Sequence, residues 1–376
     1  MNPSVSIIIL NYNGKKFLGE NCLYRCVSSV LNSDYPNFEV IFFDNGSRDD
    51  SVKFIKENFS ANNKLKIIAS PKNYGYSAGN NIALRYAKGK YVVLLNNDVE
   101  VKSNWLRELI EVMEADPTIA IAQSKILSFD GVTIQTAGNV LDITLSTYHV
   151  GFGEKDNGQY DRIFEITFAS GAALIVRRSL IEKIGMFDPN YFFYHDDCDL
   201  CWRARLAGFK IVSVPSSIVY HKGKGTSIST FTEHQHFLLL LASRIGLLIK
   251  NPELKTILKL APIVGISISM DVLGMILKGD FKTPLKLFLW TLRNLGHNLK
   301  YRIIVQRQIR KVNDEEVLKT FLDSSIFILR LQRSFAHITG NNIRERFNEL
   351  ITPIMWTYYR NHIFNVSKLN NECVPG

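Results

Sequence analysis

The chain has 376 residues, 46% of them hydrophobic and 21% charged, so it can form a large core and has room for two domains. Five cysteines in a chain of this length argue against a disulfide framework and fit a reducing compartment. The apolar run at residues 5–10 is too short for a signal peptide and has no basic segment before it, so we expect a buried strand there.

The net charge of +10 belongs entirely to the C-terminal part of the chain. Residues 1–221 carry 23 Lys and Arg against 24 Asp and Glu, whereas residues 222–376 carry 22 against 11. A basic segment suggests an anionic partner, either nucleic acid or a membrane surface. Here the basic residues are interleaved with leucine-rich helical runs and do not form solvated basic faces, so we expect a membrane surface and no nucleic acid.

The first hundred residues alternate short apolar runs with amphipathic stretches. The runs predict strands at 5–10, 38–44, 65–70 and 91–98, with helices between them. Further on, the pattern predicts helices at 103–115 and 178–184 and a strand at 210–221. This alternation indicates an α/β fold with a mostly parallel sheet, in which ligands bind beyond the carboxyl ends of the strands.

Polar residues follow each of the first four predicted strands. They include Asn11, Asp44, Asn73, Asn97 and Asp98. Because the carboxyl ends of parallel strands meet at one edge of a sheet, we expect these side chains to share a ligand site.

Two of these strand ends carry an acid. Asp44 closes a buried strand, and because Ser47 or Asp49 can cap the next helix, Asp44 is predicted to accept hydrogen bonds from a base or a ribose. Asp98 is flanked by amides, which suits a hard divalent cation that keeps phosphate oxygens and waters as its other ligands. The alternatives are a helix cap for Asp44 and a turn acid for Asp98.

The predicted strand at 210–221 ends in His221, which opens the stretch HKGKGTS. With glycines spacing the loop, His221 is a candidate second metal ligand, beside Lys222 and Lys224 reaching a diphosphate. The alternative is an ordinary core or surface histidine.

The stretch YFFYHDDCDLCWRARLAGF (191–209) places Asp196, Asp197 and Asp199 among six Phe, Tyr and Trp residues. Burial of an unpartnered carboxylate is costly, and neighbouring like charges raise one another's pKa. The stretch therefore indicates a bound cation or a transferred proton. The alternative is a helix start whose acids are favoured by the macrodipole.

Six segments, taken in order, resemble glycosyltransferase family 2, most closely its rhamnosyltransferase-like branch. They are VSIIILNYNG, the strand ending in DNGS, NYGYSAGNNIAL with AKGKYVVLLNND, FASGAALIVRR, GMFDPNYFFYHDDCDLCWRARLAGF and IVYHKGKGTS. The resemblance covers residues 5 to about 230. It implies a GT-A fold at 1–230, with a nucleotide-binding half at about 1–100 and an acceptor half at about 101–230. A mostly helical, basic, apolar, membrane-associating region at 231–376 follows.

The resemblance also assigns roles to residues. Asp44 matches the acid that holds the base and ribose. Asp98 matches the metal-binding acid of the family's DxD-type motif, although Asn96 stands where the family has Asp. His221 matches a metal-binding histidine. We therefore expect Mg²⁺ or Mn²⁺ at Asp98 and His221, and nucleotide-sugar contacts from Asn11, Asp44, Asn73, Asn81, Asn97 and Lys222.

The pair Asp196-Asp197 matches the family's Glu-Asp pair, whose second acid is the usual base. Asp197 is thus the predicted base, and Asp196 is predicted to raise its proton affinity as a like-charge neighbour. Asp199 is expected to pair with Arg203 or to cap the helix. The aromatic residues Tyr191, Phe192, Phe193, Tyr194 and Trp202 are expected to form an apolar wall that stacks on sugar.

These expectations together describe an inverting glycosyltransferase. It would move a sugar from a nucleotide-diphosphate sugar (dTDP-rhamnose or a UDP-sugar) to a hydroxyl of a lipid-linked or surface-glycan acceptor, at the cytoplasmic face of the cell membrane. One alternative is a sugar nucleotidyltransferase, which needs a Gly-rich phosphate loop that NYNGKKFLGEN does not provide. The other is a catalytically silent sugar-nucleotide or glycan-binding subunit, which does not need the acid pair.

The stretch 256–277 can span a bilayer only if Lys259 and Asp271 are tolerated, and Pro262 weakens a straight helix. We therefore favour interfacial or re-entrant binding to an anionic leaflet, through helices near 237–249 and 257–277. A true span and an ordinary packed helical subdomain are the alternatives.

Overall fold

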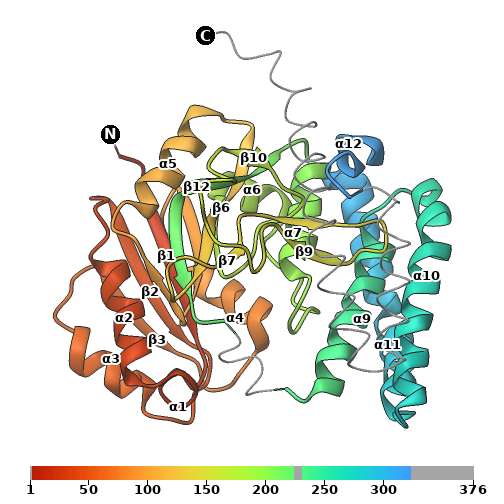
Figure 1. The fold of residues 1–376 in the computed structure, drawn as a ribbon, viewed down its shortest axis with the longest axis horizontal. Helices are drawn as coiled ribbons and strands as arrows, with labels where there is room; N and C mark the ends of the chain where they lie inside the picture. Colours follow the sequence, from red (N-terminus) through yellow and green to blue (C-terminus); the bar gives the residue numbers. More distant parts are fainter. Residues whose placement is uncertain (1, 224–230, 323–376) are drawn as a thin grey trace.

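The computed structural model describes residues 2–223 and 231–322, which form a sheet-based part and a helical part (Figure 1). The strands are β1 (Val5–Asn11), β2 (Phe38–Asp44), β3 (Leu65–Ala69), β4 (Tyr91–Asn96), β5 (Val99–Val101), β6 (Ile119–Ser128), β7 (Ile134–Thr136), β8 (Asn139–Leu141), β9 (Thr147–His149), β10 (Phe164–Glu165), β11 (Ala173–Arg177) and β12 (Lys210–His221).

The helices of the sheet-based part are α1 (Gly14–Leu18), α2 (Glu20–Leu31), α3 (Ser51–Phe59), α4 (Gly75–Ala83), the short η1 (Leu84–Tyr86), α5 (Trp105–Ala115), α6 (Arg178–Ile184) and α7 (Asp196–Leu206). The helical part contains α9 (Glu233–Lys250), α10 (Leu254–Leu277), α11 (Lys282–Ile304), η2 (Val305–Ile309) and α12 (Asp314–Leu318).

The main sheet has the strand order β10-β12-β6-β11-β4-β1-β2-β3. Strands β4, β1, β2 and β3 are parallel to one another, as are β6 and β12. Strand β11 lies antiparallel between β4 and β6 and joins the two parallel groups into one mixed sheet. The predicted α/β fold with a mostly parallel sheet is confirmed.

Alternating residues of the strands face two separate cores. In β1, Ile8 packs in one core, whereas Ile7 and Ile9 pack in the other, as the period of two in a strand requires. The core with Ile7 lies under α2, α3 and α5, and the core with Ile8 lies under α4, α6 and α7. The sheet is thus covered on both faces.

The helical part shares the second core. Leu247 of α9, Val264 of α10 and Phe321 after α12 belong to the same cluster of buried residues as α7, and the rings of Phe321 and Trp202 lie 5.1 Å apart. Lys311 N–H also donates to the carbonyl of Leu206, at 2.6 Å. These helices are therefore packed onto the sheet-based part over its α7 face (Figure 1).

The predicted elements match closely at strands 38–44 and 210–221 and at helix 178–184. In the helical part, α10 runs without interruption through Pro262. Within the described residues it is the one helix long and apolar enough to cross a membrane, and 22% of its most apolar segment is buried. The expected membrane contact through 237–249 is wrong for much of that helix, because Leu241, Ala242 and Leu247 of α9 are buried.

Candidate active site

Three side chains at the carboxyl edge of the sheet form one hydrogen-bonded row. Asn11 ends β1, directly opposite Asp44 at the end of β2. The Nδ2 of Asn11 donates to Asp44 Oδ1 at 2.8 Å. The Oδ1 of Asn11 accepts from Asn97 Nδ2 at 2.7 Å. All three are buried, and the row joins the ends of three parallel strands as the sequence predicts.

Asp44 is not left free, in contrast to the prediction. Its Oδ1 accepts from Ser47 Oγ at 2.5 Å, and its Oδ2 accepts from Ser47 N–H at 3.0 Å. Asp49 accepts from Lys16 N–H and Ser51 N–H, so it holds the start of α3. Asp44 therefore closes the Asn-Gly-Ser turn by accepting two hydrogen bonds from Ser47. A ligand at this position would meet the backbone of the turn.

Asp98 and His221 meet at the next strand ends, as predicted, with His221 Nε2 3.1 Å from Asp98 Oδ1. Gln135 sets the histidine tautomer: its Nε2 donates to the His221 carbonyl at 2.7 Å, so its Oε1 faces His221 Nδ1 at 2.8 Å and accepts from it. The Nε2 of His221 therefore faces a carboxylate oxygen. Neither atom has a hydrogen-bond partner among residues 2–223 and 231–322.

A carboxylate and an imidazole nitrogen this close form an ion pair when the imidazole is protonated, and they also fit a divalent cation as two adjacent ligands. The Gln135 contact is the kind that orients a metal-bound histidine. A carboxylate and an imidazole are two ligands. Within the described residues no group of three or more His, Cys, Asp or Glu side chains is gathered for a metal. A cation here would take its remaining ligands from phosphate oxygens and water.

The other predicted nucleotide residues differ in availability. Asn73 Oδ1 accepts from Asn45 and from Gly75 N–H, which leaves its amide NH₂ without a protein partner among the described residues. Lys222 Nζ donates to the carbonyl of Leu18 at 3.2 Å. Lys224 lies outside the described residues.

Asn81 has a structural role. Its Nδ2 donates to the Phe187 carbonyl at 2.8 Å, and its Oδ1 accepts from Phe187 N–H at 3.1 Å. Each end of the amide is therefore used once to tie α4 to the segment before α7. This geometry gives Asn81 a structural role and does not support the predicted ligand contact.

The acid pair lies at the first turn of α7, and its two members differ in environment. Asp196 is 4% exposed, and its Oδ2 accepts from Ser77 Oγ at 2.8 Å. Asp197 is half-buried, and its Oδ2 accepts from Gly171 N–H at 3.2 Å, while its Oδ1 accepts from Cys198 N–H at 2.8 Å. Asp197 is thus the member that an incoming substrate can reach.

Burial and the neighbouring charge of Asp197 raise the pKa of Asp196 to about 7. Burial also raises the pKa of Asp197, although the Gly171 and Cys198 amides oppose this rise. The pKa of Asp197 is thus raised, as predicted, with burial as the main cause, and the charge of Asp197 in turn contributes to the raised pKa of Asp196. Two neighbouring carboxyls with raised pKa values are suited to proton transfer by the exposed member.

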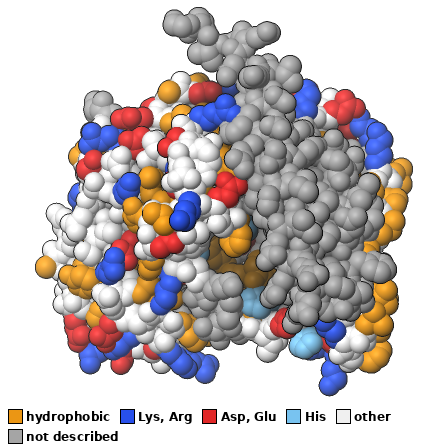
Figure 2. All heavy atoms as spheres, viewed as in Figure 1, with side chains coloured by type: hydrophobic (Ala, Val, Ile, Leu, Met, Phe, Trp, Pro, Cys, Tyr) orange, Lys and Arg blue, Asp and Glu red, His pale blue; other side chains and the backbone are white. Residues whose placement is uncertain are grey.

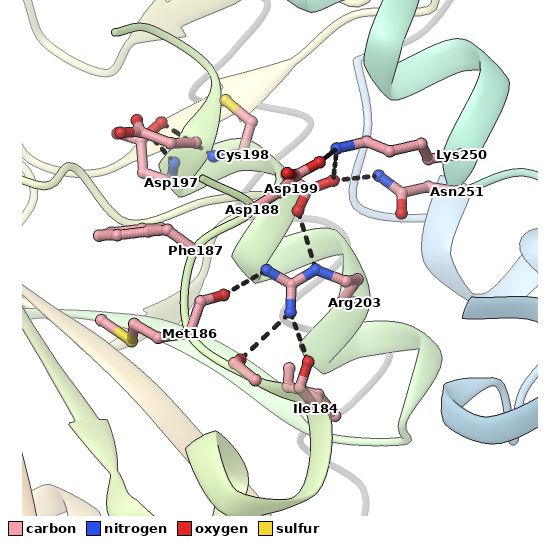
Figure 3. A network of polar contacts seen from close by, with 12 residues as sticks. Ile184, Met186, Phe187, Asp188, Asp197, Cys198, Asp199, Arg203, Lys250 and Asn251 are labelled. Carbon is pink, nitrogen blue, oxygen red and sulfur yellow. Dashed lines mark hydrogen bonds and ion pairs between the residues drawn. The ribbon is translucent and has the colours of Figure 1, made fainter. Parts of the chain in front are cut away.

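Asp199 points the other way, into a buried ion network (Figure 3). It pairs with Arg203 at 2.8 Å, as predicted, and with Lys250 of α9 at 3.1 Å, while Lys250 also contacts Asp188 at 2.7 Å. Although burial raises its pKa, the charges of Lys250 and Arg203 hold the pKa of Asp199 at about 2. The third acid is structural and fastens α9 to α7.

The predicted aromatic wall is only partly correct. Trp202 and Tyr191 are 2% and 4% exposed, and their rings contact Phe321 and Lys250 in the interior. Neither can touch a sugar. Phe192, Phe193 and Tyr194 remain at or near the surface.

Sequence reasoning missed three supporting residues: Ser77, Gly171 and Gln135. Gly171 lies in the run of small residues FASGAA, and a Cβ there would lie 2.4 Å from the Tyr76 hydroxyl, so a glycine in such a run was a usable signal. Gln135 lies 86 positions from His221, and nothing in the sequence pattern links them.

The chain is similar to known proteins over this part. Residues 6–185 match the family described as Glycosyl transferase family 2. The rhamnosyltransferase WbbL of Escherichia coli K12 is 26% identical over 246 residues, covering 61% of this chain and 87% of that protein. The low-salt glycan biosynthesis hexosyltransferase Agl10 of Haloferax volcanii is 25% identical over 215 residues, covering 56% of this chain and 64% of that protein.

Among solved structures, GalNAc-T7 with UDP, GalNAc and Mn²⁺ superposes with a TM-score of 0.56 at 15% identity, over 82% of this chain and 59% of that one. This likeness supports the fold. The chain spans less than two thirds of the length of several curated relatives that it matches, from 24% to 64%. Residues 6–185 therefore carry a glycosyltransferase family 2 domain, and the chain has a GT-A fold.

Proposed function

We propose that the protein is an inverting glycosyltransferase that moves a sugar from a nucleotide-diphosphate sugar to a hydroxyl of a lipid-linked or surface-glycan acceptor. The observation that carries the proposal is the asymmetric acid pair. Asp196 is enclosed and has a pKa of about 7, while the neighbouring Asp197 is reachable and is held by the Gly171 amide. The strand-end row and the facing Asp98 and His221 support a nucleotide diphosphate at the same edge.

In the proposed reaction, Asp197 accepts the proton of the acceptor hydroxyl. The acceptor oxygen forms a bond to C1 of the donor sugar while the bond from C1 to the diphosphate oxygen breaks, and the nucleoside diphosphate leaves. The amides of Gly171 and Cys198 fix the Asp197 carboxylate in place. Asp196 is buried and accepts a hydrogen bond from Ser77 Oγ, so it stabilises the first turn of α7 and does not contact the substrate.

Asp98 and His221 would hold a divalent cation, Mg²⁺ or Mn²⁺. Bound there, it would supply positive charge to the diphosphate. Asn11, Asn97 and the turn closed by Asp44 would line the nucleotide, and the free amide of Asn73 and the Lys222 ammonium would contact it. GalNAc-T7 was solved with UDP and Mn²⁺, which supports this choice of ligand classes.

The relatives favour a donor whose sugar is a hexose or rhamnose, since they are named a hexosyltransferase and a rhamnosyltransferase. A catalytically silent binding subunit fits the structure less well, because it has no need for an enclosed acid whose pKa is about 7 beside a reachable one.

A thermal-shift panel tests the donor class. Full-length protein is heated with UDP, GDP, dTDP or CMP, each with Mn²⁺ or with EDTA. A nucleoside diphosphate that binds the folded state raises the midpoint by mass action, and we expect one diphosphate to do so chiefly with Mn²⁺. If none of the nucleotides shifts the midpoint in either condition, the proposed donor site is wrong.

We further propose that the helical part holds the enzyme on an anionic cytoplasmic membrane surface, through one face of α10 and α11. At the N-cap and along α11, Phe281, Leu285, Phe288 and Leu292 are between 54% and 66% exposed and recur every three or four residues. Leu254, Leu258 and Leu277 of α10 are 63% to 69% exposed. Hydrophobic side chains follow this edge of the molecule in Figure 2.

Charge favours a bilayer as the occupant of that face. Lys282, Lys286, Arg293 and Lys300 are exposed and each follows an exposed apolar residue of α11 by one position, so they border the stripe. The acids of these helices are already paired, Asp271 with Arg244 and Asp280 with His234. An apolar stripe beside a basic row is typical of an interfacial helix, with about 1 kcal/mol of attraction for each basic residue near the surface.

Flotation with phosphatidylglycerol vesicles tests this face. We expect full-length protein to float, less so in high salt, and the double variant Leu285→Gln/Leu292→Gln to remain at the bottom. The control is Val132→Gln/Ile163→Gln, which removes two apolar side chains that are each 50% exposed on the sheet-based part. Wild-type protein that fails to float at low salt, or a variant that floats like wild type, refutes the membrane face.

A further inference from the structure

A cluster of aromatic rings lies where the segment before α7 meets the start of α9. Phe192 and Phe231 are 6.1 Å apart at 83°, and Phe193 and Phe231 are 5.8 Å apart. The His236 ring lies 5.5 Å from Phe231 and 5.7 Å from Tyr194. We call these five residues the aromatic platform. None of the five carries a carboxylate, ammonium or guanidinium group.

The platform stands beside the proposed base. Asp197 follows Phe193 by four positions in the chain. The Tyr76 ring packs edge-on against Phe193, 6.1 Å away, and its hydroxyl donates to the Gly171 carbonyl at 2.7 Å. The N–H of the same Gly171 donates to Asp197. One residue, Tyr76, thus contacts both the platform and Gly171, the residue whose N–H positions the base.

Phe192 is held firmly although its ring is 41% exposed. Its carbonyl accepts from Tyr76 N–H at 3.0 Å, and its ring lies so close to Gly75 that a Cβ there would be 2.7 Å away. The next residues, Tyr194 and His195, have φ of 70° and 57°, a conformation that costs a non-glycine residue about 1 kcal/mol or more. Ser243 of α9, 2.9 Å from His195 Nδ1, helps to hold that turn.

We propose that Phe192, supported by Phe231, is the subsite that stacks on the sugar ring of the acceptor, and that this ring is uncharged. The proposal rests on the proposed function and names the acceptor class for the same site. Pyranose rings present C–H groups of slight positive charge, which meet the negative face of an aromatic ring. Among the described residues, the platform offers no carboxylate, ammonium or guanidinium group to a uronic acid or a phosphorylated sugar.

A fixed, partly exposed ring near a reachable carboxylate also suits the orientation of an acceptor hydroxyl toward a base. Correct orientation of the reactants removes a large part of the activation barrier of such a reaction. Two parts of the chain build the platform, because Phe231 and His236 belong to the helical part. The acceptor subsite would then be completed only when α9 is packed on the turn before α7.

The test uses saturation-transfer NMR on full-length protein with UDP and Mn²⁺ present. The probes are the methyl glycosides of glucose, galactose, N-acetylglucosamine and rhamnose, with octanol as a sugar-free apolar probe. The variants are Phe192→Leu, which keeps an apolar side chain but removes the ring, and Phe192→Tyr, which keeps the ring. Phe129→Leu is the matched control, because Phe129 is 42% exposed on another part of the surface.

We expect saturation of the ring protons of at least one glycoside, reduced roughly 3- to 10-fold in Phe192→Leu and preserved in Phe192→Tyr and Phe129→Leu. Three results overturn the proposal: equal saturation in Phe192→Leu, saturation of octanol without any glycoside, or no saturation of any glycoside. Thermal shifts with UDP are measured on the same samples. If neither UDP nor any other nucleotide of the panel shifts the wild-type midpoint, the donor site is wrong, whereas a nucleotide shift beside any of the three results refutes this subsite alone.

Discussion

The sheet-based part and the helical part place their side chains in opposite ways. In the sheet-based part the long apolar strands are buried on both faces, and the exposed large hydrophobic side chains are scattered. In the helical part, Arg244 and Lys250 are buried in ion pairs, while leucines of α10 and α11 face outward. The helical part is therefore joined to the sheet-based part by buried ion pairs as well as by a shared apolar core, and the described residues leave the outward leucines of α10 and α11 exposed.

Removing the buried ammonium group of Lys250 tests this comparison, and it has the largest expected effect on stability. In Lys250→Met, Asp188 and Asp199 lose their shared ammonium, although Asp199 keeps Arg203 and Asp188 keeps His297. Breaking such a buried pair costs about 3–5 kcal/mol. We expect the free energy of unfolding, from urea titration, to fall by that amount.

The matched control is Lys255→Met, because Lys255 is 60% exposed and pairs only across the surface with Glu253. Its effect should be within about 1 kcal/mol. Equal stability of the two variants would mean that the ion network does not join the two parts.

Removal of one of the proposed metal ligands, Asp98 or His221, is expected to have a smaller effect, on nucleotide affinity. In His221→Ala or Asp98→Ala, one of two proposed ligands is lost, and we expect the affinity for UDP with Mn²⁺ to fall about 10- to 100-fold in calorimetric titrations. Asp44→Asn, which changes the turn and not the pair, should weaken binding with and without EDTA. Full affinity of the wild type in EDTA would rule out the metal role.

Asp196 gives the smallest change, and it depends on pH. Its pKa is raised to about 7 in the folded state from a usual value of 3.8, so between these values the folded chain binds more protons than the unfolded chain. The free energy of unfolding contributed by this group therefore falls as the pH rises through the window and levels off above pH 7. Asp196→Asn removes this dependence.

Relative to wild type, the Asp196→Asn variant should gain roughly 1–3 kcal/mol of stability between pH 5 and pH 8. Urea titrations of both proteins at the two pH values measure this difference. A difference that does not change with pH would show that Asp196 is not the enclosed, protonated member of the pair.

The residues that sequence placed well are those fixed by local pattern. Asn11 and Asp44 end buried strands and Asn97 follows a third, and the register of these strands follows from apolar runs, so their meeting at one edge could be predicted. Asp199 and Arg203 are four positions apart on a helix, and the pairing followed from that spacing.

The errors concern side chains whose partners are distant in the chain. Asn81 is occupied by Phe187, 106 positions away, and Trp202 is covered by Phe321. An amphipathic pattern gives the face of a helix but not what packs on it, so α9 was expected at a membrane when it packs on α7. The exposed stripe of α11 has the same pattern as a buried one, and only the fold shows that nothing in the described part of the chain covers it.

The central claim is that Asp197 removes the proton of the acceptor. The most direct measurement is the rate of nucleoside diphosphate release from the donor in the presence of an acceptor glycoside, for wild type, Asp197→Asn and Asp196→Asn, with UDP binding measured in parallel. The account predicts that Asp197→Asn loses about 10²-fold or more in rate while nucleotide binding is unchanged. An Asp197→Asn enzyme that turns over like wild type, beside an inactive Asp196→Asn enzyme, would contradict it.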